Sequence, residues 1–392
     1  MKEKLKTFMR AVRPLRREEQ EKLKEIKQFI QDDQFSRVLF NYRQKNISLA
    51  HSSVETSELL DISAEFPQLV LINEDHILQE FVNSVNDAVQ KKVEHGLYRA
   101  FSRNPKRIKS IIAPNIMGLD EIKDAVMLQL FSTDHVHVLL LGDPGTGKTQ
   151  ILHAASELSP ISSFGLGSGT SAAGLSVVIK GKEILKGLLP QADNGLCAID
   201  ELNLMKSQDY AALYNAMEKG FISYDKGGIH QRLDARVSVL ATANPKGDRF
   251  VGKSVEMLKK QLPFDPALLS RFNLAFLVRK PGLEEFKEIS RKIVRDQKVK
   301  VNENDKKFVR GYLEFAQKIE VDFPKRFEKR IIELSEEIKK NEKRYLVEIS
   351  PRLVIGIIRF AKASARMHLR KQVNDEDFET VKKLVLRSLD VK

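Results

Sequence analysis

The sequence predicts an α/β fold in which a parallel sheet flanked by helices is preceded by a helical domain and followed by a helical lid. Between residues 111 and 281, apolar runs alternate with helical patterns, and such runs are typical of strands buried on both faces of a parallel sheet. A glycine-rich turn followed by Lys-Thr closes the first of these runs. On either side of this region, apolar residues recur at the three- and four-residue spacing of amphipathic helices.

Residues 1–100 are predicted to form the N-terminal helical domain. In the segments 18–30 (EEQEKLKEIKQFI) and 77–89 (ILQEFVNSVNDAV), apolar side chains fall on one helical face among charges and amides. Residues 101–110 (FSRNPKRIKS) are polar, basic and interrupted by a proline, which predicts a linker.

The predicted α/β core, residues 111–281, contains four apolar runs that we expect to be strands. After it, residues 282–392 show helical periodicity of aliphatic and charged residues without strand patterns, which predicts a separate helical lid. The four runs are HVHVLLLG (135–142), LCAIDE (196–201), VSVLATANP (237–245) and LAFLVRKPG (274–282).

Composition and charge limit the class of protein. The 392 residues carry a formal net charge of +13, which is as compatible with a nucleic-acid partner as with solvated lysines. No run of about 18 apolar residues occurs, so we expect a cytoplasmic, nucleoid-associated protein without a membrane span. The single cysteine, Cys197, excludes a disulfide framework and a thiolate zinc site within this chain, and we expect it only to fill space.

The most specific motif is GDPGTGKTQ, which meets every position of a phosphate-binding P-loop between a strand and a helix. Its glycines let backbone N–H groups approach phosphate oxygens at a helix N-terminus. Lys148 is expected to reach the β- and γ-phosphates and Thr149 to bind Mg²⁺, so the predicted cofactors are ATP and Mg²⁺. The predicted nucleotide-binding residues are Gly142, Asp143, Pro144, Gly145, Thr146, Gly147, Lys148, Thr149 and Gln150.

Further polar residues stand where an ATPase needs them. Asp200 and Glu201 end an apolar run after the P-loop, where Asp200 suits a magnesium anchor and Glu201 a base for the attacking water. Asn244 ends the next run and either orients that water or caps the following turn. Arg271 precedes the last run, where it is either a solvated side chain or a finger supplied to the ATP of a neighbouring subunit.

The order of these motifs resembles that of one family. The segments GDPGTGKTQ, GSGTSAAGLS, ADNGLCAIDE, AMEKGFISYDKGGI, ARVSVLATANP and DPALLSRFN follow one another as in the ATPase core of the minichromosome maintenance (MCM) replicative helicases, a branch of the AAA+ superfamily. The resemblance runs from Ile108 to Leu277 and extends more weakly to ISPRLVIGIIRFAKASARM in the lid. It implies a P-loop AAA+ core.

The resemblance also implies roles for single residues. Asn244 corresponds to sensor 1, Arg271 to the arginine finger that acts on a neighbouring subunit, and Arg352 to sensor 2. These three are expected to meet at a subunit interface, which implies a homo-oligomeric ring, a hexamer. Ile116 and Met117 lie in the segment that runs along the adenine in the family, although they also suit an ordinary core.

Two segments resemble the DNA-contacting hairpins of the family. FISYDKGGIHQRL alternates in the manner of a β-hairpin around Lys226, and GLSVVIKGKEILKGL turns near Gly181 between Lys180 and Lys182. In a ring these lysines would line the channel and contact DNA phosphates without reading sequence, whereas on an isolated hairpin they would be solvated. The predicted partner is single-stranded or forked DNA.

The sequence also departs from the family pattern. Full-length members carry an OB-fold with a zinc module before the core, and we expect neither in this chain. LNLM after the acid pair, SRFN and SPRLVIG each differ from the usual pattern. These departures predict a short, divergent member.

The predicted function is that of an ATP-dependent DNA helicase or translocase in replication. One alternative is a paralogue that regulates or assembles with a full-length helicase or another replication protein without unwinding DNA. The other is a AAA+ protein remodeller of the MoxR or chelatase type. Basic charge and the KGGI hairpin favour DNA, and the complete set of catalytic residues favours turnover.

Overall fold

The computed structural model describes residues 95–180, 183–226, 229–247, 249–252, 254–295 and 301–390. They belong to two compact units, one containing residues 95–103 and 302–308 and the other the remaining described residues. The helices predicted for residues 1–94 lie outside the described residues. In the first unit, Tyr98 and Phe101 pack their rings against Phe308 at centroid distances of 5.4 and 5.2 Å.

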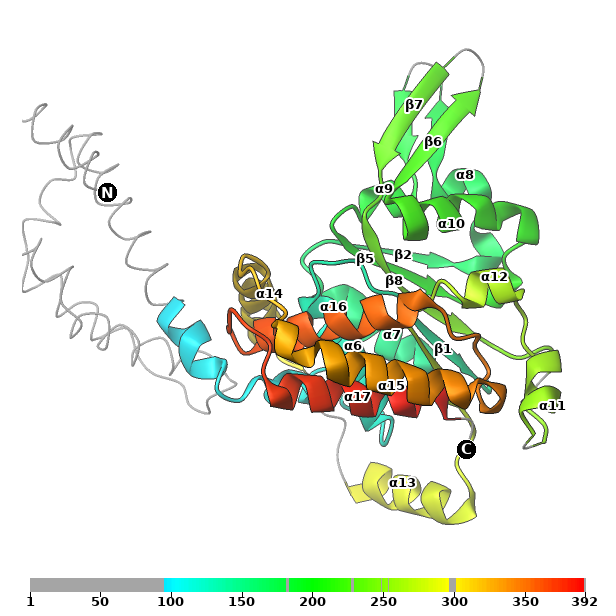
Figure 1. Ribbon diagram of the computed structural model, residues 1–392. Helices are drawn as coiled ribbons and strands as arrows, with labels where there is room; N and C mark the ends of the chain where they lie inside the picture. The colour runs from blue at the N-terminus through cyan, green and yellow to red at the C-terminus, as the bar shows by residue number, and fades with distance from the viewer. Residues whose placement is uncertain are drawn as a thin grey trace, which may run out of the picture. The chain divides into compact units, whose positions relative to one another are not determined.

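The second unit is built on one parallel five-stranded sheet in the order β2-β5-β8-β1-β9, which confirms the predicted α/β fold (Figure 1). All four predicted strands are present, and β2 is an additional edge strand. The strands are β1 (Val138–Gly142), β2 (Ser162–Leu166), β5 (Gly195–Asp200), β8 (Val237–Ala243) and β9 (Leu274–Val278).

Apolar sequence explains the central strands. Every residue of β1 and β8 is buried, as expected for strands covered on both faces. Helices α6 (Asp120–Phe131) and α7 (Lys148–Leu158) pack on the sheet. Cys197 in β5 is fully buried, and its burial raises the pKa of the thiol to about 11, so it fills space as predicted.

Because the strands are parallel, their ends define two opposite edges of the sheet. The register of β1 and β9 pairs Val138 with Leu274 and Gly142 with Val278. We call the edge where the strands end the carboxyl edge and the edge where they start the amino edge. A five-residue strand separates the two by about 16 Å.

Both predicted hairpins are present. β3 (Val177–Lys180) pairs antiparallel with β4 (Glu183–Lys186), and β6 (Phe221–Lys226) with β7 (Ile229–Asp234). The β6–β7 hairpin extends beyond the central sheet, next to α10 (Tyr210–Lys219) (Figure 1). The turn residues 181–182 and 227–228 lie outside the described residues, and with them Lys182. Lys180 and Lys226 are the last residues of their strands.

Part of the segment predicted as a linker belongs to the second unit. Residues 105–110 form a 3-10 helix, and Ile108 within it is fully buried. A proline at the start of this helix fixes the backbone angle that the first turn needs. The basic and polar residues of this segment therefore gave no sign that Ile108 is buried in the core.

The region after β9 is helical, and its last two helices pack on the sheet by contacting α6 and β9. Arg366 donates a hydrogen bond to Phe131 O at 3.0 Å, and Gln317 donates one to Leu130 O at 3.1 Å. Phe327 and Phe378 stack in the lid core at 5.4 Å. The helices are α13 (Leu283–Arg295), α14 (Glu303–Gln317), α15 (Glu328–Lys340), α16 (Pro351–Met367) and α17 (Asp375–Leu389).

Among the residues that the structure describes, no helix is both long and apolar enough to cross a membrane.

Shorter helices connect the elements described above. The short α-helices are α8 (Ala172–Leu175), α9 (Leu188–Gln191), α10 (Tyr210–Lys219), α11 (Val255–Lys260) and α12 (Pro266–Leu269). The 3-10 helices are η3 (Pro105–Ser110), η4 (Gly167–Gly169), η5 (Leu202–Leu204), η6 (Ser207–Asp209), η7 (Lys325–Phe327) and η8 (Glu342–Arg344).

Candidate active site

The P-loop joins β1 to α7 at the carboxyl edge. Gly145 and Gly147 have φ angles of 78° and 86°, a left-handed conformation that glycine adopts without steric cost. A Cβ on Gly147 would come within 2.7 Å of Ile116 Cδ1, so a larger residue there would require the Ile116 side chain to move. The loop leads directly into the N-terminus of α7, where free N–H groups favour an anion.

Lys148 folds back over this loop. Its Nζ donates hydrogen bonds to Gly142 O and Asp143 O, both at 2.8 Å. Burial lowers the pKa of the ammonium to about 8, although the carboxylates of Asp143, Asp200 and Glu201 favour its charged form. The negative charge of a bound phosphate would stabilise the buried ammonium of Lys148.

Asp143 has a structural role within the P-loop. Its Oδ1 accepts the Phe250 N–H at 2.8 Å, and its Oδ2 accepts the Lys280 N–H at 3.0 Å. The carboxylate is buried and ties the P-loop to the chain segments that follow β8 and β9. The Asp143 N–H donates to Val278 O at 2.9 Å, so both its carboxylate and its N–H are used in hydrogen bonds within the protein.

A hydroxyl and a carboxylate converge next to the P-loop. Thr149 Oγ1 donates to Asp200 Oδ1 at 3.2 Å, joining the start of α7 to the end of β5. Thr242 on β8 donates a second hydrogen bond to the same Oδ1. Magnesium binds through one or two protein oxygens together with phosphates and water, and Thr149 and Asp200 fit that donor set. No group of three His, Cys, Asp or Glu side chains suited to a metal occurs in the described part of the chain.

Thr242 also fixes the backbone of Glu201. The Glu201 N–H donates to Thr242 Oγ1 at 2.9 Å. Glu201 has φ 51° and ψ 45°, a conformation that costs energy for a residue other than glycine and persists only where the surroundings impose it. Gly167 packs closely against the backbone of Glu201, because a Cβ on Gly167 would lie 2.1 Å from Glu201 O. The fold thus holds Glu201 in a strained conformation beside Asp200.

Asn244 lies at the same edge, directly after β8. Its N–H donates to Asn203 Oδ1 at 2.9 Å, so the turn after β5 and the end of β8 are bonded to each other. Asn244 is half-buried. The P-loop, the acid pair and Asn244 therefore share one edge of the sheet, where ligands of open α/β sheets bind.

The segment that contains Ile116 and Met117 lies against the P-loop, and both side chains are half-buried. Lys123 on α6 holds this segment by donating to Ile116 O at 2.7 Å and to Ala113 O at 3.0 Å. The contact of Ile116 with Gly147 supports a position next to a bound nucleotide.

Arg271 and Arg352 lie at the opposite edge. Arg271 is three residues before β9, and the Asn273 side chain donates to Arg352 O at 3.4 Å. Asn273 Oδ1 in turn accepts the N–H of His137, which precedes β1. The structure therefore brings the two arginines together at the amino edge and leaves Asn244 at the carboxyl edge of the same chain.

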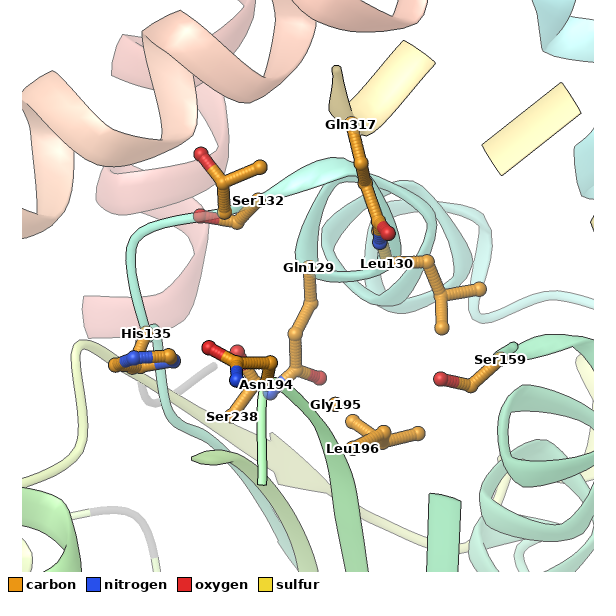
Figure 2. Close-up of a pocket in the computed structure, with 11 residues that line it drawn as sticks. Gln129, Leu130, Ser132, His135, Ser159, Asn194, Gly195, Leu196, Ser238 and Gln317 are labelled. Carbon is orange, nitrogen blue, oxygen red and sulfur yellow. The ribbon is translucent and has the colours of Figure 1, made fainter. Parts of the chain in front are cut away.

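A cavity of about 160 Å³ opens at strand starts and is separate from the P-loop (Figure 2). Its lining is mostly polar and uncharged, with Ser132, Ser159 and Ser238 among the residues around it. The amide of Gln129 donates to Val136 O and Val239 O, both at 2.9 Å, while its buried Oε1 has no hydrogen-bond partner. Water is the ordinary occupant of such a polar cavity.

Sequence reasoning missed three residues that organise these edges. Thr242 and Asn203 hold the carboxyl edge, and Glu218 contacts both arginines at the amino edge. A hydroxyl near the end of a mostly apolar strand was the available signal for Thr242. The contacts of Asn203 and Glu218 are long-range and leave no local pattern.

Comparison with known proteins gives the family. A model of the MCM P-loop domain matches residues 98–297, and a model of the MCM AAA-lid domain matches residues 307–389. Minichromosome maintenance protein MCM of Saccharolobus solfataricus is 31% identical over 341 residues, covering 80% of this chain and 49% of that protein. Zygotic DNA replication licensing factor mcm6 of Xenopus tropicalis is 31% identical over 308 residues, covering 70% of this chain and 37% of that protein.

A third relative, DNA replication licensing factor MCM4 of Arabidopsis thaliana, is 30% identical over 323 residues, covering 74% of this chain and 38% of that protein. The chain thus spans half or less of the length of these curated relatives. The match to the P-loop domain alone extends over half of the chain and includes the P-loop, the acid pair and both hairpins described above. The chain belongs to the minichromosome maintenance family of AAA+ proteins.

Proposed function

We propose that this chain is an ATP-driven DNA translocase and helicase that works as a homo-oligomeric ring, a hexamer, in DNA replication. One observation carries the proposal: the P-loop and Arg271 lie at opposite edges of one sheet. Arg271 precedes β9, whereas the P-loop follows β1, its parallel neighbour. A strand length of about 16 Å keeps the arginine from its own P-loop, so its use in catalysis requires a second subunit.

Within one subunit, each residue at the carboxyl edge has a defined part in hydrolysis. The P-loop N–H groups and Lys148 bind the phosphates, while Thr149 and Asp200 provide oxygen ligands for Mg²⁺. The metal ion, when bound, neutralises charge that develops on the phosphates. Glu201 accepts a proton from the attacking water, and Asn244 orients that water.

The partner subunit completes the site. Arg271 and Arg352 of one subunit would contact the γ-phosphate held by the P-loop of the next, where a guanidinium stabilises transition-state charge. Such head-to-tail contacts close into rings when the rotation between subunits permits. We further propose residues 282–392 as the lid that carries Arg352, the α/β core at residues 111–281, and the segment 101–110 as the connection to a helical domain at residues 1–100.

DNA is the substrate that the basic charge favours over a remodelled protein. The net charge of +13 suits a polyanion, and Lys226 ends β6 at the tip of a hairpin that extends from the sheet. In a ring, Lys226, Lys180 and Lys182 would contact phosphates in the channel. The names of the relatives, which include DNA replication licensing factors, agree with this choice.

Steady-state ATP hydrolysis with and without single-stranded DNA tests the proposal. The measurement is made at one low salt concentration, because phosphate contacts weaken steeply with salt. We expect DNA to raise turnover of the wild type and to leave Lys226→Ala at its unstimulated rate. A rate of ATP hydrolysis that does not change when DNA is added would indicate a protein remodeller. Absence of hydrolysis would indicate a regulatory or assembly paralogue. Either result contradicts the proposal.

Thr242→Val is expected to lower turnover by about 10- to 100-fold. The substitution keeps the shape of the side chain but removes a hydrogen bond to the Asp200 carboxylate and the acceptor for the Glu201 N–H, each worth about 1–3 kcal/mol. Titration of activity with Mg²⁺ should show a weaker apparent affinity. Thr242→Ser keeps the hydroxyl and should retain most activity. Equal losses in the two variants would argue against the hydrogen bonds as the cause.

Nucleotide binding is expected to take up protons above neutral pH. The pKa of Lys148 is lowered to about 8 by burial, and a bound phosphate favours the charged ammonium. The affinity is then highest below pH 8 and falls as the pH rises through that value towards 10.5. Calorimetry at about pH 8 should record an uptake of up to about half a proton when buffers of different ionisation enthalpy are compared. Heats independent of the buffer would contradict this assignment.

A further inference from the structure

Glu218 is the point where the two arginines of the amino edge meet. It lies on α10, one residue before the helix ends. Its Oε2 accepts a hydrogen bond from Arg271 Nη2 at 2.9 Å, and its Oε1 lies 3.5 Å from Arg352 Nη2. One carboxylate thus joins a guanidinium that follows α12 to a guanidinium on the first turn of α16.

The remaining contacts fix the direction of each guanidinium. Arg271 Nη1 donates to Ala267 O at 2.6 Å, and Arg352 Nη1 donates to Ser270 O at 3.3 Å. The Arg271 guanidinium also lies over the Tyr214 ring at 4.3 Å. Since Tyr214 and Glu218 are one turn apart on α10, the same helix face supports Arg271 through a ring and through a carboxylate.

Charge explains why a carboxylate is needed at this place. Two guanidinium groups that converge on one point repel each other, and an acidic group between them offsets that repulsion. The group of Glu218, Arg271 and Arg352 retains one net positive charge and suits a phosphate. Arg271 has 18% of its side chain exposed and Arg352 37%, so both remain reachable at the surface.

We infer that Glu218 is a positioning residue that holds Arg271 and Arg352 as a pair, so that both reach the triphosphate bound by the neighbouring subunit. The inference rests on the proposed function, because it presumes a shared site. Glu218 itself touches neither nucleotide nor water in this account. Its effect passes entirely through the orientation of the two arginines.

Kinetics of Glu218 variants test the inference. Glu218→Ala is expected to lower kcat of the assembled protein by about 10- to 100-fold, because misplaced arginines stabilise less transition-state charge. The KM for ATP should change by less than about threefold, because the P-loop is intact. Glu218→Gln keeps the shape and one acceptor and should lose less. The control is Glu314→Gln on the exposed face of α14, with unchanged kcat expected. Thermal midpoint and particle mass are measured for every variant.

A double-mutant cycle separates positioning from general stabilisation. In the Arg271→Ala background, Glu218→Ala should lower kcat by clearly less than in the wild type, because Glu218 then acts only through Arg352. Wild-type kcat in both Glu218 variants, or a loss that multiplies fully with that of Arg271→Ala, overturns the inference alone. If Arg271→Ala itself hydrolyses ATP as fast as the wild type, or if the wild type does not hydrolyse ATP, the proposed function and the inference both fail.

Discussion

Arg271→Ala is expected to lower ATP turnover of the assembled protein by about a thousandfold or more, because an arginine finger contributes that much to phosphoryl transfer. The loss corresponds to about 4 kcal/mol of transition-state stabilisation. Binding of ATP should persist, since the P-loop lies at the other edge of the sheet. Turnover and equilibrium binding of a fluorescent ATP analogue, measured on the same preparation, separate these two effects.

Arg271→Lys and Arg344→Ala serve as companions in that experiment. Lysine keeps the charge but lacks the planar fork that reaches Glu218 and Ala267 O together, so Arg271→Lys should also lose most turnover. Arg344 is exposed on η8, and its alanine variant should match the wild type. Full activity in Arg271→Lys would mean that only the positive charge at position 271 is needed, and not the planar guanidinium. A loss of ATP binding as large as the loss of turnover would place its effect within its own subunit.

Glu201→Gln is expected to abolish measurable hydrolysis while ATP binding stays within a few-fold of the wild type. Glutamine has nearly the same shape but cannot accept the proton of the attacking water. Its backbone should keep the strained conformation, because the hydrogen bond to Thr242 and the contact with Gly167 involve the main chain. Phosphate release in a single turnover measures the chemical step directly.

The matched control is again Glu314→Gln, an exposed glutamate whose variant should hydrolyse ATP normally. With ATP present, Glu201→Gln should remain bound to single-stranded DNA, since ATP persists in its sites. Residual hydrolysis near the wild-type rate would mean that another group serves as the base. Loss of ATP binding would mean that Glu201 has a structural role.

Local motifs were predictable because the residues that form them are close together in the sequence. The P-loop needs left-handed glycines and a lysine at fixed spacing, and the structure has Gly145 and Gly147 in that conformation. Strands β1 and β8 were predictable because each is buried along its whole length and is therefore mostly apolar. The β6–β7 hairpin followed from alternation around a pair of glycines, whereas the β3–β4 hairpin followed from the family resemblance.

Features that depend on long-range packing were not predictable. Strand β2 reads SSFGL, and as an edge strand it is only partly buried, so it lacks an apolar run. Glu218 meets Arg271 across 53 residues of sequence, and nothing near AMEKG marks it. The separation of Arg271 from the P-loop became visible only in the register of β1 with β9. The roles of the predicted site residues remain predictions until the variants are measured.

Mixing two inactive variants tests the shared site most directly. Glu201→Gln subunits lack the base but supply Arg271, whereas Arg271→Ala subunits lack the finger but supply the base. In a random equal mixture, about a quarter of head-to-tail interfaces join an intact base to an intact finger. We therefore predict that ATP hydrolysis, which is about a thousandth of the wild-type rate or less in each variant alone, returns to about a quarter of the wild-type rate when the two are mixed and allowed to exchange subunits. A mixture as inactive as its components, with subunit exchange verified by mass, would contradict a catalytic site shared between subunits.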